Sequence, residues 1–108
     1  MSAEKSIKAI KTFSEIAGSR NPFGTEKVAR LDEYINKEVI IKDFVIDEGP
    51  NFNMAYILVV DPETREEVTL RTTSQVIQKQ LQMMEQYLKE GIAVKAVIRK
   101  RKRYLTFE

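Results

Sequence analysis

The sequence predicts a mainly β domain: a five-stranded Greek-key barrel with one helix between its third and fourth strands and a helical extension before it. Three observations lead to this prediction. Segments rich in β-branched and aromatic residues follow one another between residues 38 and 72. A single apolar stripe of helical period lies between residues 74 and 91. Two more strand-like segments then follow before residue 108.

The N-terminal part is expected to be helical. Four apolar residues recur at steps of three and would share one helix face: Ile7, Ile10, Phe13 and Ile16. We place this helix over Met1–Ala17, because the turn-forming stretch Gly18–Gly24 ends it. Val28–Asn36 fits either a short helix or a strand with a turn. We therefore expect a helical extension over residues 1–36 that packs on a barrel over residues 37–108, within one compact domain.

Three strands are predicted in the middle of the chain, separated by loops of turn-forming residues. The second of these loops, Asp61–Thr64, contains Pro62, which suits the second position of a type I turn. The first loop is Asp47–Asn51. The three strands lie, in chain order, at Val39–Ile46, Met54–Val60 and Glu67–Thr72.

One clear helix follows the third strand. Ser74 is a good N-cap, and Gly91 stands where a C-terminal cap glycine belongs. Between them, four apolar residues form a stripe that is most simply core: Ile77, Leu81, Met84 and Leu88. Two strands, Ile92–Arg99 and Tyr104–Phe107, come after the helix and are joined by a short cationic turn. This order of elements is that of the OB-fold.

The composition favours a binding protein over an enzyme. The chain has no cysteine and no histidine, so a thiolate zinc site, a disulfide and the commonest general base are excluded. Phosphate-binding and hydrolase motifs are missing, and Asp43, Asp47 and Glu48 lack the converging partners of a magnesium nuclease site. Since there is neither a membrane-length apolar run nor a signal-peptide core, we expect a soluble cytoplasmic protein without metal, cofactor or membrane contact.

Positive charge is concentrated at the C-terminal end. The net charge is +2, but residues 89–108 hold seven Lys or Arg and only two Glu. The run Arg99–Arg103 consists of five consecutive cations. A hairpin tip that is charged only for solubility would normally mix signs, so this run favours an anion-binding surface, nucleic acid above all.

A surface for single-stranded nucleic acid needs cations that follow the phosphates and flat rings that stack on unpaired bases. An OB barrel carries both mainly on its second and third strands and the flanking loops. The predicted phosphate contacts are Lys42, Arg71, Lys95, Arg99, Arg101 and Arg103. The predicted stacking rings are Phe44, Phe52, Tyr56 and Tyr104.

The rings differ in how well the pattern supports stacking. Phe44 fits core and stacking equally, whereas Phe52 lies in a polar stretch that has few neighbours to bury it. Tyr56 is expected to be partly exposed because of its hydroxyl, and Tyr104 follows the cationic run. The remaining rings considered are assigned to the core or its edge: Tyr34, Tyr87 and Phe107.

Four segments carry a resemblance to a known family: Lys8–Gly18, Leu31–Ile41, Leu70–Leu81, and Ile98–Lys100 with Arg103–Phe107. Together they resemble the small OB-fold single-stranded DNA-binding proteins of bacteriophages and related mobile elements. The resemblance implies sequence-independent binding of single-stranded DNA in replication or recombination. It also implies replication or recombination proteins as further partners.

Other functions stay open at this point. An RNA-binding OB module would use the same chemistry and would differ in its response to the 2′-hydroxyl. A protein-interaction module could instead use the basic C-terminal hairpin to bind an acidic partner. A homodimer could form through a free sheet edge or the N-terminal helix, although nothing in the pattern requires one.

Overall fold

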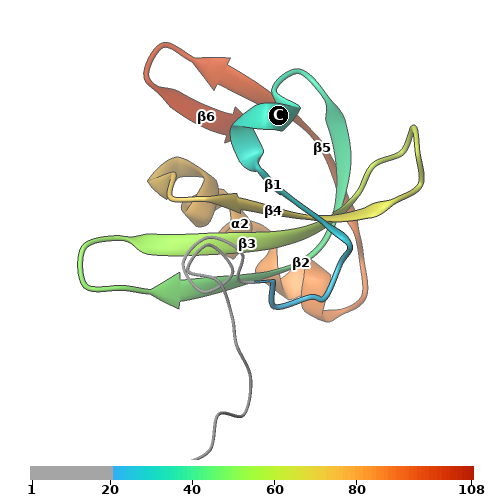
Figure 1. Cartoon of the computed structure of the whole chain (residues 1–108), viewed down its shortest axis with the longest axis horizontal. Coiled ribbons are helices and arrows are strands. Elements are labelled where there is room, and N and C mark those ends of the chain that lie inside the picture. Colours follow the sequence, from blue (N-terminus) through green and yellow to red (C-terminus); the bar gives the residue numbers. More distant parts are fainter. Residues whose placement is uncertain (1–20) are drawn as a thin grey trace, which may run out of the picture.

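A computed structural model of the protein describes residues 21–108, so the helix predicted over Met1–Ala17 lies outside the described residues. Residues 21–108 form six strands, one α-helix and one short 3-10 helix, whose arrangement is shown in Figure 1. Their bounds, in chain order, are β1 (Lys27–Arg30), η1 (Leu31–Tyr34), β2 (Glu38–Glu48), β3 (Asn53–Val60), β4 (Glu67–Thr72), α2 (Gln75–Lys89), β5 (Val94–Arg101) and β6 (Tyr104–Phe107).

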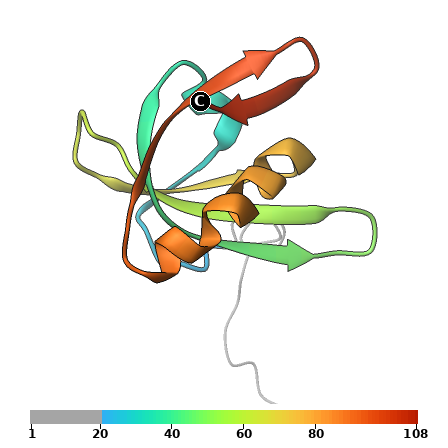
Figure 2. The ribbon, with the colours of Figure 1, turned by 180° about the vertical axis from the view of Figure 1, so that it is seen from behind.

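The strands form one curled sheet with the order β1-β4-β3-β2-β5-β6. The prediction of a mainly β fold is confirmed, but the sheet has six strands where the sequence predicted five. Seen from behind in Figure 2, the sheet curls into a half-barrel and α2 crosses its open side. The extra strand β1 pairs in parallel with β4, so it occupies the second edge of β4. Within residues 21–108, β6 pairs with β5 alone.

The segment that the sequence left open between helix and strand contains one of each. Val28 and its neighbours form β1, and η1 follows at once. Leu31 and Tyr34 of η1 are buried in the same core as the central strands. The ammonium groups of Lys27 and Lys37 lie 5.4 and 5.1 Å from the centroid of the Tyr34 ring. A hydrogen bond to the Tyr34 hydroxyl raises the pKa of Lys27.

A bulge in β2 lets one strand serve two neighbours. Glu38–Ile41 pairs with β5, whereas the strand beyond Lys42 pairs with β3 alone. The register shifts between Ile41 and Asp43, and such a bulge bends the strand and increases its twist. The outer half of the β2–β3 hairpin therefore leaves the body of the sheet and projects from it (Figure 1).

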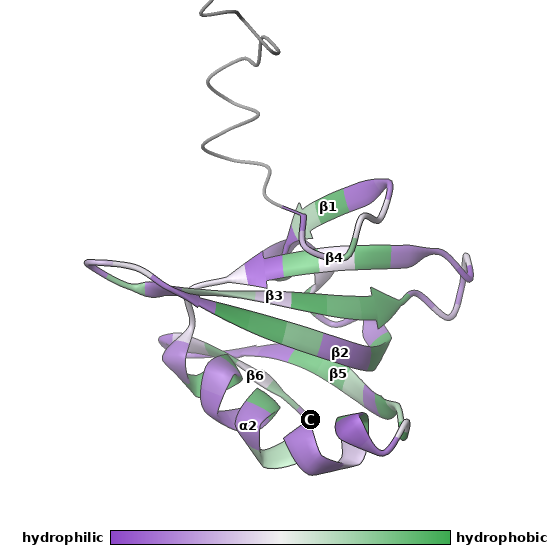
Figure 3. Cartoon of the chain, turned by 90° about the horizontal axis from the view of Figure 1, so that it is seen from below, coloured by the Kyte–Doolittle hydropathy of each residue, from purple (hydrophilic) through white to green (hydrophobic). Residues whose placement is uncertain are grey.

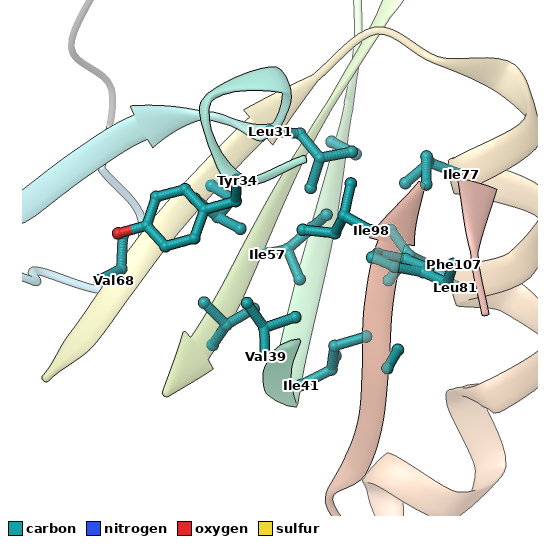
Figure 4. Packing of buried hydrophobic residues seen from close by; sticks show 14 of the residues in the cluster. Leu31, Tyr34, Val39, Ile41, Ile57, Val68, Ile77, Leu81, Ile98 and Phe107 are labelled. Carbon is teal, nitrogen blue, oxygen red and sulfur yellow. The ribbon is translucent and has the colours of Figure 1, made fainter. Parts of the chain in front are cut away.

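The hydrophobic core lies between the curled sheet and the helices. Figure 4 shows the side chains of η1, the central strands, α2 and β6 converging on one cluster. Ile57, Leu70, Ile77, Leu81 and Ile98 are completely buried in it. The hydropathy colouring of Figure 3 shows the same division, with apolar residues along the strands and mostly hydrophilic residues on α2. Burial of these aliphatic side chains is the main favourable contribution to folding.

The local signals for α2 are confirmed. The Ser74 hydroxyl oxygen accepts a hydrogen bond from the Ile77 N–H at 3.3 Å, as an N-cap should. Gly91 follows the helix with φ +83°, in the left-handed region that favours glycine. Ile77 and Leu81 are buried, and Met84 and Leu88 pack against the core from the same stripe. Within residues 21–108, no helix is long and apolar enough to cross a membrane.

Gln80 of α2 holds the last strand through its side-chain amide. The amide nitrogen donates to the Thr106 hydroxyl at 2.9 Å and to the Phe107 carbonyl at 3.1 Å. The amide oxygen accepts from the Phe107 N–H at 2.9 Å. The side chain thus pairs with the backbone of β6 much as a neighbouring strand would.

We expect Gln80→Leu to destabilise the fold by about 1–3 kcal/mol, because it leaves the Phe107 N–H without its acceptor in a largely buried place. The Phe107 carbonyl loses one of two donors and keeps the Thr106 hydroxyl at 3.2 Å. Gln82→Leu is the matched control, since Gln82 is exposed on the same helix. Urea unfolding followed by circular dichroism measures both variants. Equal midpoints for the two would contradict this role of Gln80.

Candidate nucleic-acid interface

Two hairpins project to the same side of the molecule, with the start of α2 between them (Figures 1 and 2). One is the β2–β3 hairpin, whose tip is Gly49–Phe52, and the other is the β5–β6 hairpin, whose tip is Lys102–Arg103. Between them lie three adjoining hollows, which we together call the inter-hairpin groove. Its parts adjoin through shared lining residues, from Phe52 through Met54 and Leu105 to Tyr104.

Two of the five consecutive cations are engaged by other residues of the protein and are therefore less available to a ligand. The Arg99 guanidinium donates to the Asn36 side-chain oxygen at 2.7 Å, and Arg101 pairs with the carboxylate of Glu108. For the other three, the structure records no ion pair with any residue of 21–108, and all three are exposed: Lys100, Lys102 and Arg103. We call these three the hairpin cations.

Turn geometry does not account for the charges at this tip. Two-residue hairpin loops favour Asn-Gly or similar pairs because their best turns need positive φ. Among the described non-glycine residues, only Asn36 and Arg65 have positive φ, so the Lys102–Arg103 turn places no such demand on the sequence. The cations are therefore free to serve another purpose, such as attraction of a polyanion.

Two of the predicted stacking rings are exposed, one on each hairpin. Phe52 has 58% of its surface exposed and Tyr104 has 48%. The Gly49 N–H donates to the Phe52 carbonyl at 3.1 Å, and a Cβ on Gly49 would lie 2.8 Å from that oxygen. Glycine at position 49 therefore permits the tight tip that presents Phe52. Lys100, Arg103 and Tyr104 line the same part of the groove.

The other two rings are not presented in this way. The expected exposure of Tyr56 is wrong, because its side chain is 8% exposed. Val45 and Arg71 are its cross-strand partners and flank it on the sheet. The sequence left Phe44 open between a core and a stacking role. In the structure its side chain is partly buried and packs against the core cluster, which supports the core role. The expected core position of Phe107 is confirmed. Tyr34, expected at the core edge, is buried within the core, whereas Tyr87, expected at the same edge, is 49% exposed.

Two predicted phosphate contacts lie apart from the inter-hairpin groove. Lys42 forms an ion pair with Glu67 at 2.8 Å, which satisfies its charge on the surface. Lys95 lies beside an apolar hollow between α2 and β5, together with Met83, Tyr87 and Ile92. Neither side chain lines the inter-hairpin groove, whereas Lys100 and Arg103 do, and Lys102 lines an adjoining hollow together with Lys100 and Tyr104.

Arg71 lies in the groove, and a second arginine that the sequence did not single out lies beside it. Arg30 of β1 is the register partner of Arg71 on β4, and both line the hollow that Met54 and Leu105 also line. The sequence could not indicate this pair, because it depends on the parallel pairing of β1 with β4. Lys100 and Lys102 were missed as site residues although they belong to the cationic run that pointed to the surface.

The middle of the sheet face next to Tyr56 is also occupied. Thr69 is fully buried, and its hydroxyl bonds to the side chains of Asn21 and Thr25 at 3.0 and 2.7 Å. The segment before β1 therefore covers part of β4. This part of the sheet face is therefore not open to a ligand.

The described residues 21–108 contain no group of three His, Cys, Asp or Glu side chains that could hold a metal ion. Comparison of the chain with protein-family models, curated proteins and solved structures gives no match. The chemistry of the groove therefore carries the functional argument by itself.

Proposed function

We propose that this protein binds single-stranded DNA without regard to sequence, in replication or recombination, and that its curled sheet is an OB-type barrel extended by β1. The observation that carries the proposal is the inter-hairpin groove, with exposed rings on both hairpins and, on one of them, three exposed cations for which no ion pair within residues 21–108 is recorded. Rings supply stacking surfaces that any base can use, and cations supply attraction to any phosphate. Neither kind of contact reads a base edge.

The positions of the two exposed rings favour a single strand over a duplex. Phe52 and Tyr104 stand on separate hairpins, so a strand that reaches both must present unpaired bases along its path. In a duplex the bases are stacked and paired inside, where neither ring can reach a base face without unpairing it. The groove therefore favours single strands over duplexes.

Binding should depend strongly on salt. If the three hairpin cations and Arg71 each neutralise one phosphate, the slope of log affinity against log salt concentration should be about −3, from about −0.7 for each contact. Fluorescence anisotropy with a labelled oligothymidine and a duplex of equal length, in a salt series, measures both the slope and the preference. A slope near zero, or equal affinity for the duplex, would refute the proposal.

The same titration separates the alternatives. Competition with an RNA oligomer of matched sequence shows whether a 2′-hydroxyl changes affinity, which an RNA-binding module requires. A protein-interaction module that uses the cationic hairpin predicts weak binding to every oligonucleotide. Incubation of the labelled strand with magnesium and protein, followed by electrophoresis, detects a nuclease by shortening of the strand.

A further inference from the structure

Arg71 is the cation whose surroundings in the groove are hardest to explain by folding alone. Its side chain is half-buried, and its Nε is buried without an acceptor among the described residues. A buried polar group of a charged side chain that lacks a hydrogen bond lowers the stability of the fold. Such a group in a folded protein needs an explanation, and the binding of a ligand is one.

The neighbour of Arg71 adds to this cost. Arg30 is directly opposite Arg71 in the parallel pairing of β1 and β4, and like charges in register repel each other. Arg30 is compensated, since its guanidinium lies 3.3 Å from Asp32 and 3.9 Å from Glu33. Within residues 21–108, no ion pair is recorded for Arg71.

Both arginines line a cleft of about 220 Å³ in the floor of the inter-hairpin groove. Asp32 also lines this cleft, but its carboxylate is engaged by Arg30, so no carboxylate among residues 21–108 is recorded as compensating Arg71. Thr72 and Thr73 add hydroxyl groups to the lining. The Thr72 oxygen already accepts from the Ser74 N–H at 3.1 Å, which leaves its O–H free to donate to a ligand.

We propose that this cleft binds a single phosphate group, with Arg71 as its principal ligand and Arg30 and Thr72 as further donors. A guanidinium presents Nε–H and Nη–H groups in a fork that matches two oxygens of a phosphate, which a lysine cannot do. Arg71 turns from its buried position so that both kinds of N–H donate to the anion. This deepens the proposed function: the hairpin cations attract the strand, and Arg71 fixes one of its phosphates.

Nuclear magnetic resonance of the arginine Nε–Hε groups tests the site without any nucleic acid. Sodium phosphate is titrated into the full chain, with sodium chloride at matched ionic strength as the reference. We expect a saturable shift of the Arg71 signal in phosphate, and no such shift for Arg65, which is exposed in the β3–β4 loop. Equal responses in phosphate and chloride would overturn the site.

Two variants test the role of Arg71 in strand binding. Arg71→Lys keeps the charge and removes the fork, so affinity for oligothymidine should fall roughly tenfold or more while the salt slope stays near that of the natural sequence. Arg71→Met should bind weakly and yet unfold at a higher temperature, because the unsatisfied donor and the like-charge pair are both removed. A lower unfolding temperature with unchanged affinity would assign Arg71 a purely structural role and refute the proposal.

The outcomes distinguish this site from the function on which it rests. If oligothymidine binds and Arg71→Lys binds it equally well, the phosphate site is wrong and the proposed function stands. If oligothymidine does not bind but the Arg71 signal responds to phosphate, the proposed function is wrong and the site stands. Oligomers with and without a terminal phosphate show the source of the group: equal affinity indicates a diester within the strand, and tighter binding of the phosphorylated oligomer indicates a strand end.

Discussion

Replacing all three hairpin cations by glutamine (Lys100→Gln, Lys102→Gln and Arg103→Gln) should weaken binding of single-stranded DNA about 100-fold at 0.1 M salt. The figure follows from about 0.7 log units of affinity lost for each phosphate contact at that salt concentration. The slope of log affinity against log salt should change from about −3 to about −1. Fluorescence anisotropy with single-stranded oligonucleotides of several different sequences should show the same loss for every sequence.

Two controls show whether charge at this hairpin is what matters. Lys100→Arg, Lys102→Arg and Arg103→Lys together keep every charge and should leave affinity within about threefold. Arg65→Asn with Lys89→Gln removes two exposed cations elsewhere and should change affinity little. If this distant pair weakened binding as much per charge as the hairpin variant, the attraction would belong to the whole molecule and not to the groove.

The choice of cations departs from the one that the sequence favoured. A variant of Arg99, Arg101 and Arg103 would remove two side chains that serve the fold, because Arg99 bonds to Asn36 and Arg101 pairs with Glu108. Its effect on binding would then be mixed with an effect on stability. The hairpin cations avoid this problem, since no bond to a described residue is recorded for their side chains.

Replacing the exposed rings should give the second large effect. Phe52→Ala and Tyr104→Ala should each reduce affinity by about 1–3 kcal/mol, or roughly 5- to 150-fold, because each removes one stacking surface. Since stacking carries no net charge, the salt slope should not change in either variant. The variants therefore differ from the hairpin-cation variant in slope as well as in affinity.

Tyr87 supplies a matched control for these rings. It is 49% exposed, almost the same as the 48% of Tyr104, but it lies on α2 beside the apolar hollow and not in the groove. Tyr87→Ala should leave affinity for oligothymidine unchanged. A loss as large as that of Tyr104→Ala would place the stacking surface on the other side of the helix or show that ring removal acts through the fold.

Local patterns sufficed for most of the secondary structure. The strand Glu67–Thr72 and the strand Tyr104–Phe107 have the predicted bounds, and α2 lies between the predicted Ser74 and Gly91. Strand alternation, β-branched content and capping residues are properties of a few neighbouring positions, so a single sequence expresses them. The pattern also marked the helix stripe correctly as core, because a stripe of that period has to be buried.

Pairings between distant segments were beyond the reach of such patterns. β1 is only four residues long, and its parallel partner β4 lies some forty positions away (Lys27 opposite Val68), so nothing in the local sequence announces the pair. The pairing of Arg30 with Arg71 and the hydrogen bonds between Gln80 and Phe107 depend in the same way on contacts between elements. Arg30, Arg71 and Gln80 are residue types that are usually exposed, so none of them indicates these contacts when it is considered alone.

The sequence by itself determined that this is a mainly β chain with one capped helix and a cationic end, since these follow from residue type and short spacing. The polar neighbours of Phe52 also indicated its exposure, but only the tertiary structure decided that Tyr56 is buried and which cations have partners. Tyr56 is buried by neighbours on two other strands, whereas Phe52 and Tyr104 escape burial because their hairpins extend beyond the body of the sheet. The exposure of a side chain depends on which residues pack against it in space, and those neighbours are set by the folding of the whole domain.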